Sequence, residues 1–222
     1  MSNVLPHIKL ETGASPRHSV IWLHGLGADG EDFVPVAEEM NLPHAVRFIF
    51  PHAPMQPVTL NGGYVMRAWY DITATDIGTA QDEGGIRTSQ ASIEALIEQE
   101  IQRGSAPHNI FLAGFSQGGA IALHTGLRHA QRLGGIIALS TYLPLTQTLR
   151  AEANPAMATA PIFMAHGTSD SVVPYALGKR SAELLVASGY ALEWHEYAMT
   201  HSVCIEEVRD IEIWLAQRLQ DD

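Results

Sequence analysis

Residues 114–119 read G-F-S-Q-G-G, so one serine, Ser116, stands between glycines two residues away on either side. An apolar run precedes this segment, and a run of small residues that favours a helix follows it. That context is typical of a nucleophile elbow, a strained turn from a strand into a helix that exposes the serine hydroxyl. The alternative is a glycine-rich turn that contains a serine by chance. The flanking elements favour Ser116 as a nucleophile.

A serine hydroxyl is a weak nucleophile, so it needs a base, and the base needs an acid that orients it. Proteins with this kind of elbow carry the three groups in the order Ser, Asp, His along the chain. Asp170 follows the apolar run 161–165, and His201 follows the β-rich run 191–197. Each alone has an ordinary explanation, since Asp170 suits a turn and His201 is one of 11 histidines. Order and position together predict a triad of Ser116, His201 and Asp170.

Acyl transfer also needs hydrogen-bond donors for the negative oxygen that develops in the transition state. One donor should be the backbone N–H of Gln117, directly after the nucleophile, and the second should come from an early strand-to-loop junction. Residues 24–27 read H-G-L-G after the first clear apolar run, and we expect the N–H of Leu26 to be this second donor. This chemistry requires no metal ion and no cofactor. His195 and Glu196 do not extend to the H-E-x-x-H zinc motif.

The same early loop supports a second hypothesis of a different class. Gly25, Gly27 and Gly30 match G-x-G-x-x-G, the fingerprint of a dinucleotide-binding turn. Two features oppose a nucleotide-binding module. The next predicted strand, residues 46–50, does not end in the acidic residue that would hold a ribose hydroxyl. In addition, Pro35 falls inside the helix that should point at the pyrophosphate.

These candidate residues need a scaffold that brings distant loops together, and the hydrophobic pattern predicts one. Six β-rich runs alternate with helical patterns, and several runs are apolar throughout, as in strands buried on both faces of a parallel sheet. The predicted strands are residues 19–24, 46–50, 109–113, 135–140, 161–166 and 191–197, and the predicted helices are residues 88–103, 117–129, 175–188 and 202–219. We therefore expect an α/β fold, one domain over residues 1–222, with a mainly parallel central sheet and helices on both faces. Residues 56–82 lack a clear period, and a long irregular segment is more often functional than idle.

The composition restricts the class of partner. With 13 basic and 24 acidic residues among 222, the net charge of −11 argues against binding to nucleic acid or to an anionic membrane surface. No apolar stretch approaches the roughly 18 residues of a membrane-spanning helix, and residues 1–11 lack the pattern of a targeting segment. The single cysteine, Cys204, excludes an intramolecular disulfide framework and suits a reducing compartment. We expect a cytoplasmic protein without stable membrane insertion.

Taken together, these motifs resemble those of the small α/β-hydrolases of the carboxylesterase and acyl-protein thioesterase family. The segments that carry the resemblance are residues 23–27 (L-H-G-L-G), 50–54 (F-P-H-A-P), 57–63 (P-V-T-L-N-G-G), 67–71 (R-A-W-Y-D), 113–120 (A-G-F-S-Q-G-G-A) and 166–170 (H-G-T-S-D). The resemblance implies an α/β-hydrolase fold with Ser116 as nucleophile, His201 as base and Asp170 as its orienting acid. The motifs leave no room between them for a large cap domain, so we expect an open site.

The implied activity is hydrolysis of carboxylic esters, or of thioesters, with short to medium acyl chains through an acyl-enzyme intermediate. The alternative within the family is acyl-protein thioesterase or lysophospholipase activity on longer acyl chains. The segment around Trp69 is implied to line the acyl pocket, and Leu60 and Met66 are further candidates for substrate contact. The alternative for these three side chains is ordinary packing. The expected partner is a small-molecule ester or thioester, and a homodimer is one expected assembly because related enzymes are often dimers.

Two positions depart from the family pattern. Thr200 stands where a glycine usually precedes the histidine, and a β-branched residue restricts the backbone beside His201. Ile205 stands where related chains often carry proline. A displaced His201 loop would turn the chain into a binding module on an inactive hydrolase scaffold, which is a third hypothesis.

Overall fold

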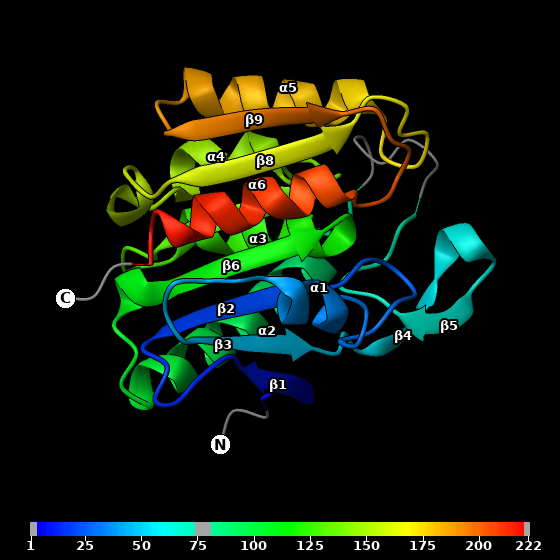
Figure 1. Ribbon diagram of the computed structural model, residues 1–222. Coiled ribbons are helices and arrows are strands. Elements are labelled where there is room, and N and C mark those ends of the chain that lie inside the picture. The colour runs from blue at the N-terminus through cyan, green and yellow to red at the C-terminus, as the bar shows by residue number, and fades with distance from the viewer. Residues whose placement is uncertain (1–3, 74–80, 220–222) are drawn as a thin grey trace.

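A seven-stranded sheet forms the centre of the computed structural model, which describes residues 4–73 and 81–219 (Figure 1). The strand order is β1-β3-β2-β6-β7-β8-β9; β1 pairs antiparallel with β3, and the other neighbouring strands are parallel. The strands are β1 His7–Glu11, β2 His18–Leu23, β3 Val46–Pro51, β6 Ile110–Phe115, β7 Gly135–Leu139, β8 Ile162–Gly167 and β9 Leu192–Tyr197. The carboxyl ends of the parallel strands meet at one edge, where the predicted site residues follow them.

All six predicted strands are present, which confirms the mainly parallel α/β sheet. Apolar runs identified the interior strands, because parallel strands are covered on both faces; the edge strand β9 is only partly buried. The edge strand β1, His7–Glu11, was not among the predictions. Its residues are at most half-buried, so it carries no apolar run that would distinguish it from a loop.

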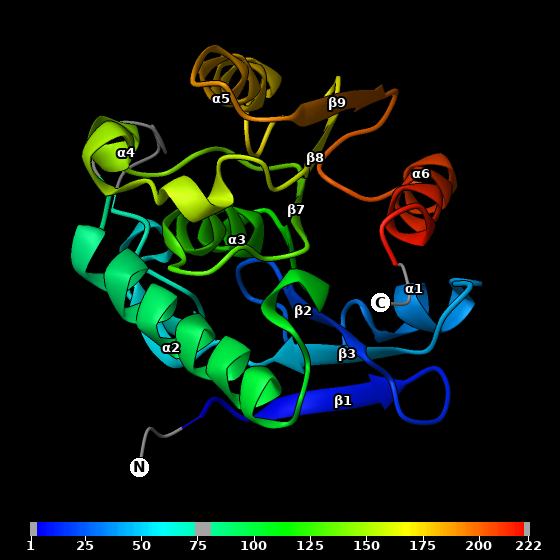
Figure 2. The same ribbon diagram turned by 90° about the vertical axis from the view of Figure 1, so that its left-hand side faces the viewer.

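Helices cover both faces of the sheet, as predicted (Figure 2). They are α1 Val34–Glu39, α2 Glu83–Gln102, α3 Gln117–Arg128, α4 Thr146–Glu152, α5 Tyr175–Ala187 and α6 Ile205–Ala216, with short 3-10 turns at η1 Thr59–Asn61, η2 Pro107–Asn109 and η3 Pro155–Met157. The helices α2 to α5 lie on one face, and α1 and α6 lie on the other. Each face has its own apolar core: Ile93 of α2 packs in one, and Trp214 of α6 packs in the other.

The helix boundaries differ from the predictions for local reasons. The helix α2 begins at Glu83 rather than residue 88, because the Asp82 side chain accepts a hydrogen bond from the N–H of Gly85 (2.9 Å) and caps the first turn. The last helix begins at Ile205, three residues later than predicted. The helices α1 and α4 were missed because two turns or fewer are too short to show a helical period.

The irregular segment 56–82 contains a small hairpin that its pattern did not reveal. The strands β4 Met55–Val58 and β5 Tyr64–Arg67 pair antiparallel and project beside the main sheet (Figure 1). Gly62 and Gly63, with φ of 66° and 80°, make the turn between them. The hairpin was missed because four-residue strands with mixed exposure carry little periodic signal. The part of the segment from 74 to 80 lies outside the described residues.

The carboxyl edge of the sheet carries loops and this hairpin, without a large cap domain among the described residues. The expectation of an open site therefore agrees with the fold. Within residues 4–73 and 81–219, no helix is both long and apolar enough to cross a membrane.

Candidate active site

Ser116 lies on the sharp turn between β6 and α3, with φ of 55° and ψ of −120°. This backbone conformation is strained for a residue with a side chain, and such strain persists only where the surroundings enforce it. A Cβ at Gly114 would overlap the backbone of Gly118, and a Cβ at Gly118 would overlap the carbonyl of Leu23. The Thr141 hydroxyl donates to the Ser116 carbonyl over 2.6 Å and fixes the turn from the β7 side.

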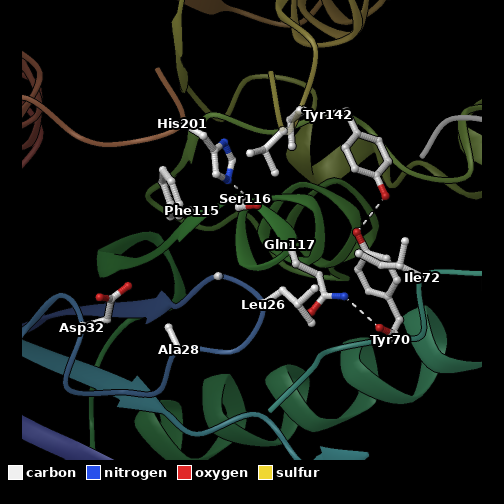
Figure 3. A pocket seen from close by; sticks show the side chains of 13 residues that line it. Leu26, Ala28, Asp32, Tyr70, Ile72, Phe115, Ser116, Gln117, Tyr142 and His201 are labelled. Atoms are coloured by element: carbon white, nitrogen blue, oxygen red, sulfur yellow. Dashed lines mark hydrogen bonds between the residues drawn. The ribbon is translucent and has the colours of Figure 1, made fainter. Parts of the chain in front are cut away.

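The structure brings Ser116, His201 and Asp170 together from three different loops. His201 Nε2 lies 2.9 Å from Ser116 Oγ (Figure 3), and His201 Nδ1 lies 2.7 Å from Asp170 Oδ2. The other oxygen of Asp170 accepts the backbone N–H groups of Val172 and Val173, both over 2.9 Å. The carboxylate is buried, so these bonds fix its orientation.

The hydrogen bonds around His201 determine which nitrogen carries the proton. A carboxylate can only accept, so Asp170 selects the tautomer with the proton on Nδ1, and Nε2 faces the Ser116 hydroxyl as an acceptor. Behind Asp170, His166 Nε2 lies 2.9 Å from the Val173 carbonyl and 3.4 Å from Asp170 Oδ2. Burial lowers the pKa of His166, which keeps this ring neutral beside the carboxylate.

The loop that carries His201 is tied to the loop that carries Asp170. The N–H of Thr168 donates to the Tyr197 carbonyl (2.9 Å), and the N–H of Ser169 donates to the Met199 carbonyl (3.0 Å). The ring of His201 also packs on the Phe115 ring, with 4.7 Å between centroids. Thr200 therefore does not displace the histidine from hydrogen-bond distance of Ser116.

Gln117 and Leu26 line the space in front of Ser116. Gln117 is the first residue of α3, so its N–H has no acceptor within the helix and remains available to a substrate oxygen. On the other side, the N–H of Gly27 donates to the Arg67 carbonyl (2.9 Å) and holds the loop that carries Leu26. This arrangement suits an oxyanion site formed by two backbone donors.

The side chain of His24 holds the loop that carries Leu26 through hydrogen bonds to the backbone. Its Nε2 accepts the N–H of Ala53 (3.1 Å), so the proton lies on Nδ1, which donates to the Gly25 carbonyl (2.7 Å). Burial lowers the pKa of His24 to about 4, and the ring stays neutral at physiological pH. In the segment H-G-L-G, the glycines form the loop and the side chain of His24 holds its backbone in place.

The side chain of Gln117 connects the nucleophile turn to the segment that follows β5. Its Oε1 accepts the N–H of Trp69 (2.8 Å), and its Nε2 donates to the Tyr70 carbonyl (2.7 Å). The Trp69 indole N–H in turn donates to the His24 carbonyl (2.9 Å). Hydrogen bonds therefore connect the turn at Gln117, the loop that carries Leu26 and the segment of Trp69 and Tyr70.

A cavity of about 240 Å³ opens in front of Ser116 (Figure 3). It is lined by Gly25, Leu26, Ala28, Asp32, Tyr70, Ile72, Phe115, Ser116, Gln117, Tyr142, Val172, Val173 and His201. The hydroxyls of Tyr70 and Tyr142 bind each other over 2.8 Å at one end of the cavity. Burial raises the pKa of Tyr142 to about 12, so this pair stays uncharged.

The three side chains expected to contact substrate lie outside this lining. Trp69 is almost fully buried and packs in the core, which agrees with ordinary packing, the alternative to substrate contact. Leu60 lies at the turn of the β4–β5 hairpin and is 42% exposed. Met66 lies behind the Leu26 loop, where its sulfur accepts from the Asn61 amide (3.4 Å). Tyr70, the neighbour of Trp69, lines the cavity instead.

The structure does not support the nucleotide-binding reading of Gly25, Gly27 and Gly30. The next helix, α1, begins at Val34, so Gly30 does not open a helix whose N-terminus could hold a phosphate. Pro35 lies in the first turn of that helix, where proline is tolerated, rather than in its interior. A Cβ at Gly30 would overlap the Phe50 carbonyl, so this glycine is explained by close packing.

A mainly parallel sheet with a serine on a strained strand-to-helix turn at its carboxyl edge defines the α/β-hydrolase fold. Residues 7–219 match the sequence profile of the phospholipase/carboxylesterase family. Acyl-protein thioesterase 1 of Yarrowia lipolytica is 38% identical over 224 residues, covering 97% of this chain and 98% of the relative. The chain belongs to the phospholipase/carboxylesterase family.

Two solved structures show the same fold. The crystal structure of Arabidopsis thaliana SOBER1 has a TM-score of 0.86 and 33% identity, covering 91% of this chain and 99% of that one. The crystal structure of Zea mays acyl-protein thioesterase 2 also has a TM-score of 0.86, with 29% identity, covering 97% of this chain and 100% of that one. The predicted family and fold are therefore confirmed.

Proposed function

We propose that this chain hydrolyses carboxylic esters and thioesters, with Ser116 as nucleophile, His201 as general base and Asp170 as the acid that orients the base. The observation that carries the proposal is the pair of contacts on His201, 2.9 Å to Ser116 Oγ and 2.7 Å to Asp170 Oδ2. Both distances lie in the range of ordinary hydrogen bonds, which a general base needs in order to take a proton.

The proposed reaction has two matching halves. Ser116 Oγ attacks the carbonyl carbon while His201 Nε2 takes the hydroxyl proton, and the N–H groups of Leu26 and Gln117 bind the oxyanion. The bond to the leaving group then breaks, and protonated His201 gives its proton to the departing oxygen or sulfur. Water attacks the acyl-enzyme by the same route, which releases the acid and restores the serine. Each proton and charge is handled by this chain's own groups, without a metal ion or cofactor.

We assign short to medium acyl chains as the preferred substrates. A cavity of about 240 Å³ with an apolar end formed by Tyr70, Ile72 and Tyr142 supports this assignment. Longer chains, as in acylated proteins or lysophospholipids, are the second candidate, favoured by the names of relatives such as the acyl-protein thioesterase 1 of Yarrowia lipolytica. A series of p-nitrophenyl esters and acyl-thiocholines from two to sixteen carbons decides between them by the position of the maximum in kcat/KM.

The first test of the proposed function is covalent labelling with a fluorophosphonate, read by intact-mass analysis. Wild-type protein should gain one adduct, and Ser116→Ala should gain none, because the phosphonate reacts with an activated serine. Ser140→Ala is a matched control, since Ser140 is a buried serine with a similarly left-handed backbone outside the cavity lining. A folded wild-type protein that takes no label would overturn the proposal and favour a binding module on an inactive scaffold.

We further propose that the chain forms a homodimer through the β4–β5 hairpin. The hairpin exposes apolar side chains that a partner subunit would cover, namely Met55, Leu60, Tyr64 and Val65. Light scattering after size exclusion should give twice the 24.1 kDa chain mass, and Tyr64→Ser with Val65→Ser should shift the protein towards the monomer. A wild-type protein that stays monomeric at high concentration would rule this assembly out.

A cytoplasmic location is the last part of the proposal. Its support is the single cysteine, Cys204, which is present as a free thiol, as suits a reducing compartment. Cell fractionation with an antibody against the chain tests it, and recovery in the membrane fraction would contradict it.

A further inference from the structure

The cavity in front of Ser116 has two chemically different ends. Tyr70, Ile72 and Tyr142 form one end, where the two ring hydroxyls satisfy each other. Asp32 lies at the other end, on the far side of Ser116 from the two tyrosines (Figure 3). A substrate that fills the site therefore has an apolar neighbour on one side and a carboxylate on the other.

Asp32 is the one acidic side chain among the described residues that line the cavity, and no lysine or arginine lines it. Within the described part of the chain, no hydrogen bond or ion pair to its side chain compensates the charge. Partial burial and the nearby charge of Asp29 both raise the pKa of Asp32, and no basic side chain opposes them. A cleft with one sign of charge concentrates field lines and attracts ligands of the opposite sign.

The two ends can be assigned to the two parts of an ester. A hydrocarbon chain gains about 25 cal/mol for each Å² of apolar surface that it buries, so the acyl chain belongs at the tyrosine end. The leaving atom must lie near His201 Nε2, which protonates it. The His201 ring packs on Phe115, which lies on the same side of Ser116 as Asp32 (Figure 3). The leaving group is therefore directed towards Asp32.

We propose that Asp32 is a specificity-determining residue that makes the site prefer esters and thioesters whose alcohol or thiol carries a positive charge. The inference rests on the proposed function and adds a substrate class to it: acyl derivatives of small ammonium alcohols and thiols. Leaving groups that carry a negative charge are disfavoured by the same carboxylate.

The expected size of the preference is modest because Asp32 is exposed to water. An exposed charge pair contributes a factor of about 1.5 to five. The preference should decline towards unity at high salt, since the screening length falls to about 3 Å at 1 M. A preference that came from shape alone would not respond to salt in this way.

The test uses substrates that differ in charge and share a shape. Butyrylcholine and 3,3-dimethylbutyl butyrate have the same acyl group, and a quaternary nitrogen in one replaces a carbon in the other. The ester of butyric acid with 2-hydroxyethanesulfonate supplies the anionic case. The readout is the ratio of kcat/KM for the cationic and neutral esters, which a general loss of activity would leave unchanged.

We expect a ratio of about 1.5 to five for wild-type protein, a ratio near one for Asp32→Asn, and a ratio below one for Asp32→Lys. Asp29→Asn is the matched control, because it removes one neighbouring carboxylate that does not line the cavity. Faster hydrolysis of the anionic ester by Asp32→Asn than by wild type would give independent support.

Three results would overturn the inference. They are a wild-type ratio near one, a ratio that Asp32→Asn leaves unchanged, and an equal loss in Asp29→Asn, which would indicate the overall charge of the protein instead. Failure of the proposed function is distinguishable, since the enzyme would then hydrolyse none of the esters and take no fluorophosphonate.

Discussion

Asp170 uses its two carboxyl oxygens for different purposes. One accepts two backbone N–H groups of its own loop, and the other accepts from His201. The two bonds to backbone N–H groups fix the carboxylate relative to its own loop. The bond to His201 then fixes the orientation of the imidazole ring. The base is therefore aligned by backbone geometry that does not depend on substrate.

Asp170→Asn tests this alignment. The amide oxygen can still accept from Val172 and Val173, which leaves an NH₂ group facing His201 Nδ1. Because that group donates, it favours the tautomer with the proton on Nε2, which cannot accept from Ser116. We expect kcat to fall by about 10³ to 10⁴-fold with little change in melting temperature.

Rates of fluorophosphonate labelling and ester hydrolysis should fall together in this variant. A variant that melts normally and keeps more than a tenth of wild-type kcat would contradict the assigned role of Asp170.

Glu207 is a second residue whose environment has a measurable consequence. It lies fully buried in the first turn of α6. Burial raises the pKa of Glu207 from an ordinary 4.5 to about 8, against the opposing influence of the Cys204 backbone. Between those pH values the unfolded chain loses a proton that the native state keeps, so Glu207 makes the protein less stable as pH rises through this range.

Glu207→Gln should remove this pH dependence, because the amide resembles the protonated carboxyl group. At pH 8.5 we expect the variant to exceed wild type by on the order of 1–3 kcal/mol in unfolding free energy, with a smaller difference at pH 5. Urea denaturation across this pH range measures the effect. Glu206→Gln, at the exposed neighbouring position, is the control, and parallel curves for wild type and Glu207→Gln would refute the assignment.

Among the elements, α6 begins close behind the His201 loop, and its first residue is Ile205. The first helical N–H has no intrahelical acceptor, so proline is favoured there. Ile205 is 68% exposed, and Cys204 before it has ψ of 166°, an extended conformation that proline tolerates in its predecessor. The departure from the family pattern at this position is therefore compatible with either residue.

Ile205→Pro should stabilise the protein by about 0.4–1 kcal/mol, because it restricts the unfolded chain without costing a native hydrogen bond. Urea denaturation gives the value, and Ile205→Ala separates the loss of the exposed side chain from the gain in rigidity. Lower stability than Ile205→Ala would show that the backbone at this position cannot accept a proline ring.

The type of element explains which parts of the fold and the site could be predicted from the sequence. The five interior strands were predictable because burial on both faces leaves largely apolar runs. Ser116, Asp170 and His201 were predictable because each follows a predicted strand. The lining of the cavity was not. Tyr142 follows β7 and Asp32 follows the Leu26 loop, and only the crossing of these distant loops in three dimensions places them around one space. Tyr70 was not among the predicted substrate contacts, because the sequence does not reveal which residues of an irregular segment face a cavity.

At the scale of the whole molecule, one sheet links the first strand to the last, with an apolar core on each face. We predict that residues 1–222 form a single domain and unfold in one cooperative transition. Circular dichroism, tryptophan fluorescence and calorimetry should give one coincident transition, with a calorimetric enthalpy equal to the van't Hoff enthalpy. Two separated transitions would divide the chain into independent units.

The tie between the His201 and Asp170 loops has a consequence for synthesis of the protein. Ser116 and its turn belong to the middle of the chain, whereas the base follows β9, close to the carboxyl end. A nascent chain can fold the nucleophile turn early, yet the serine has no base until β9 pairs with β8. During translation the protein would therefore have no activated serine until its sheet is complete. Any product shortened before residue 201 would be inactive however well it folded.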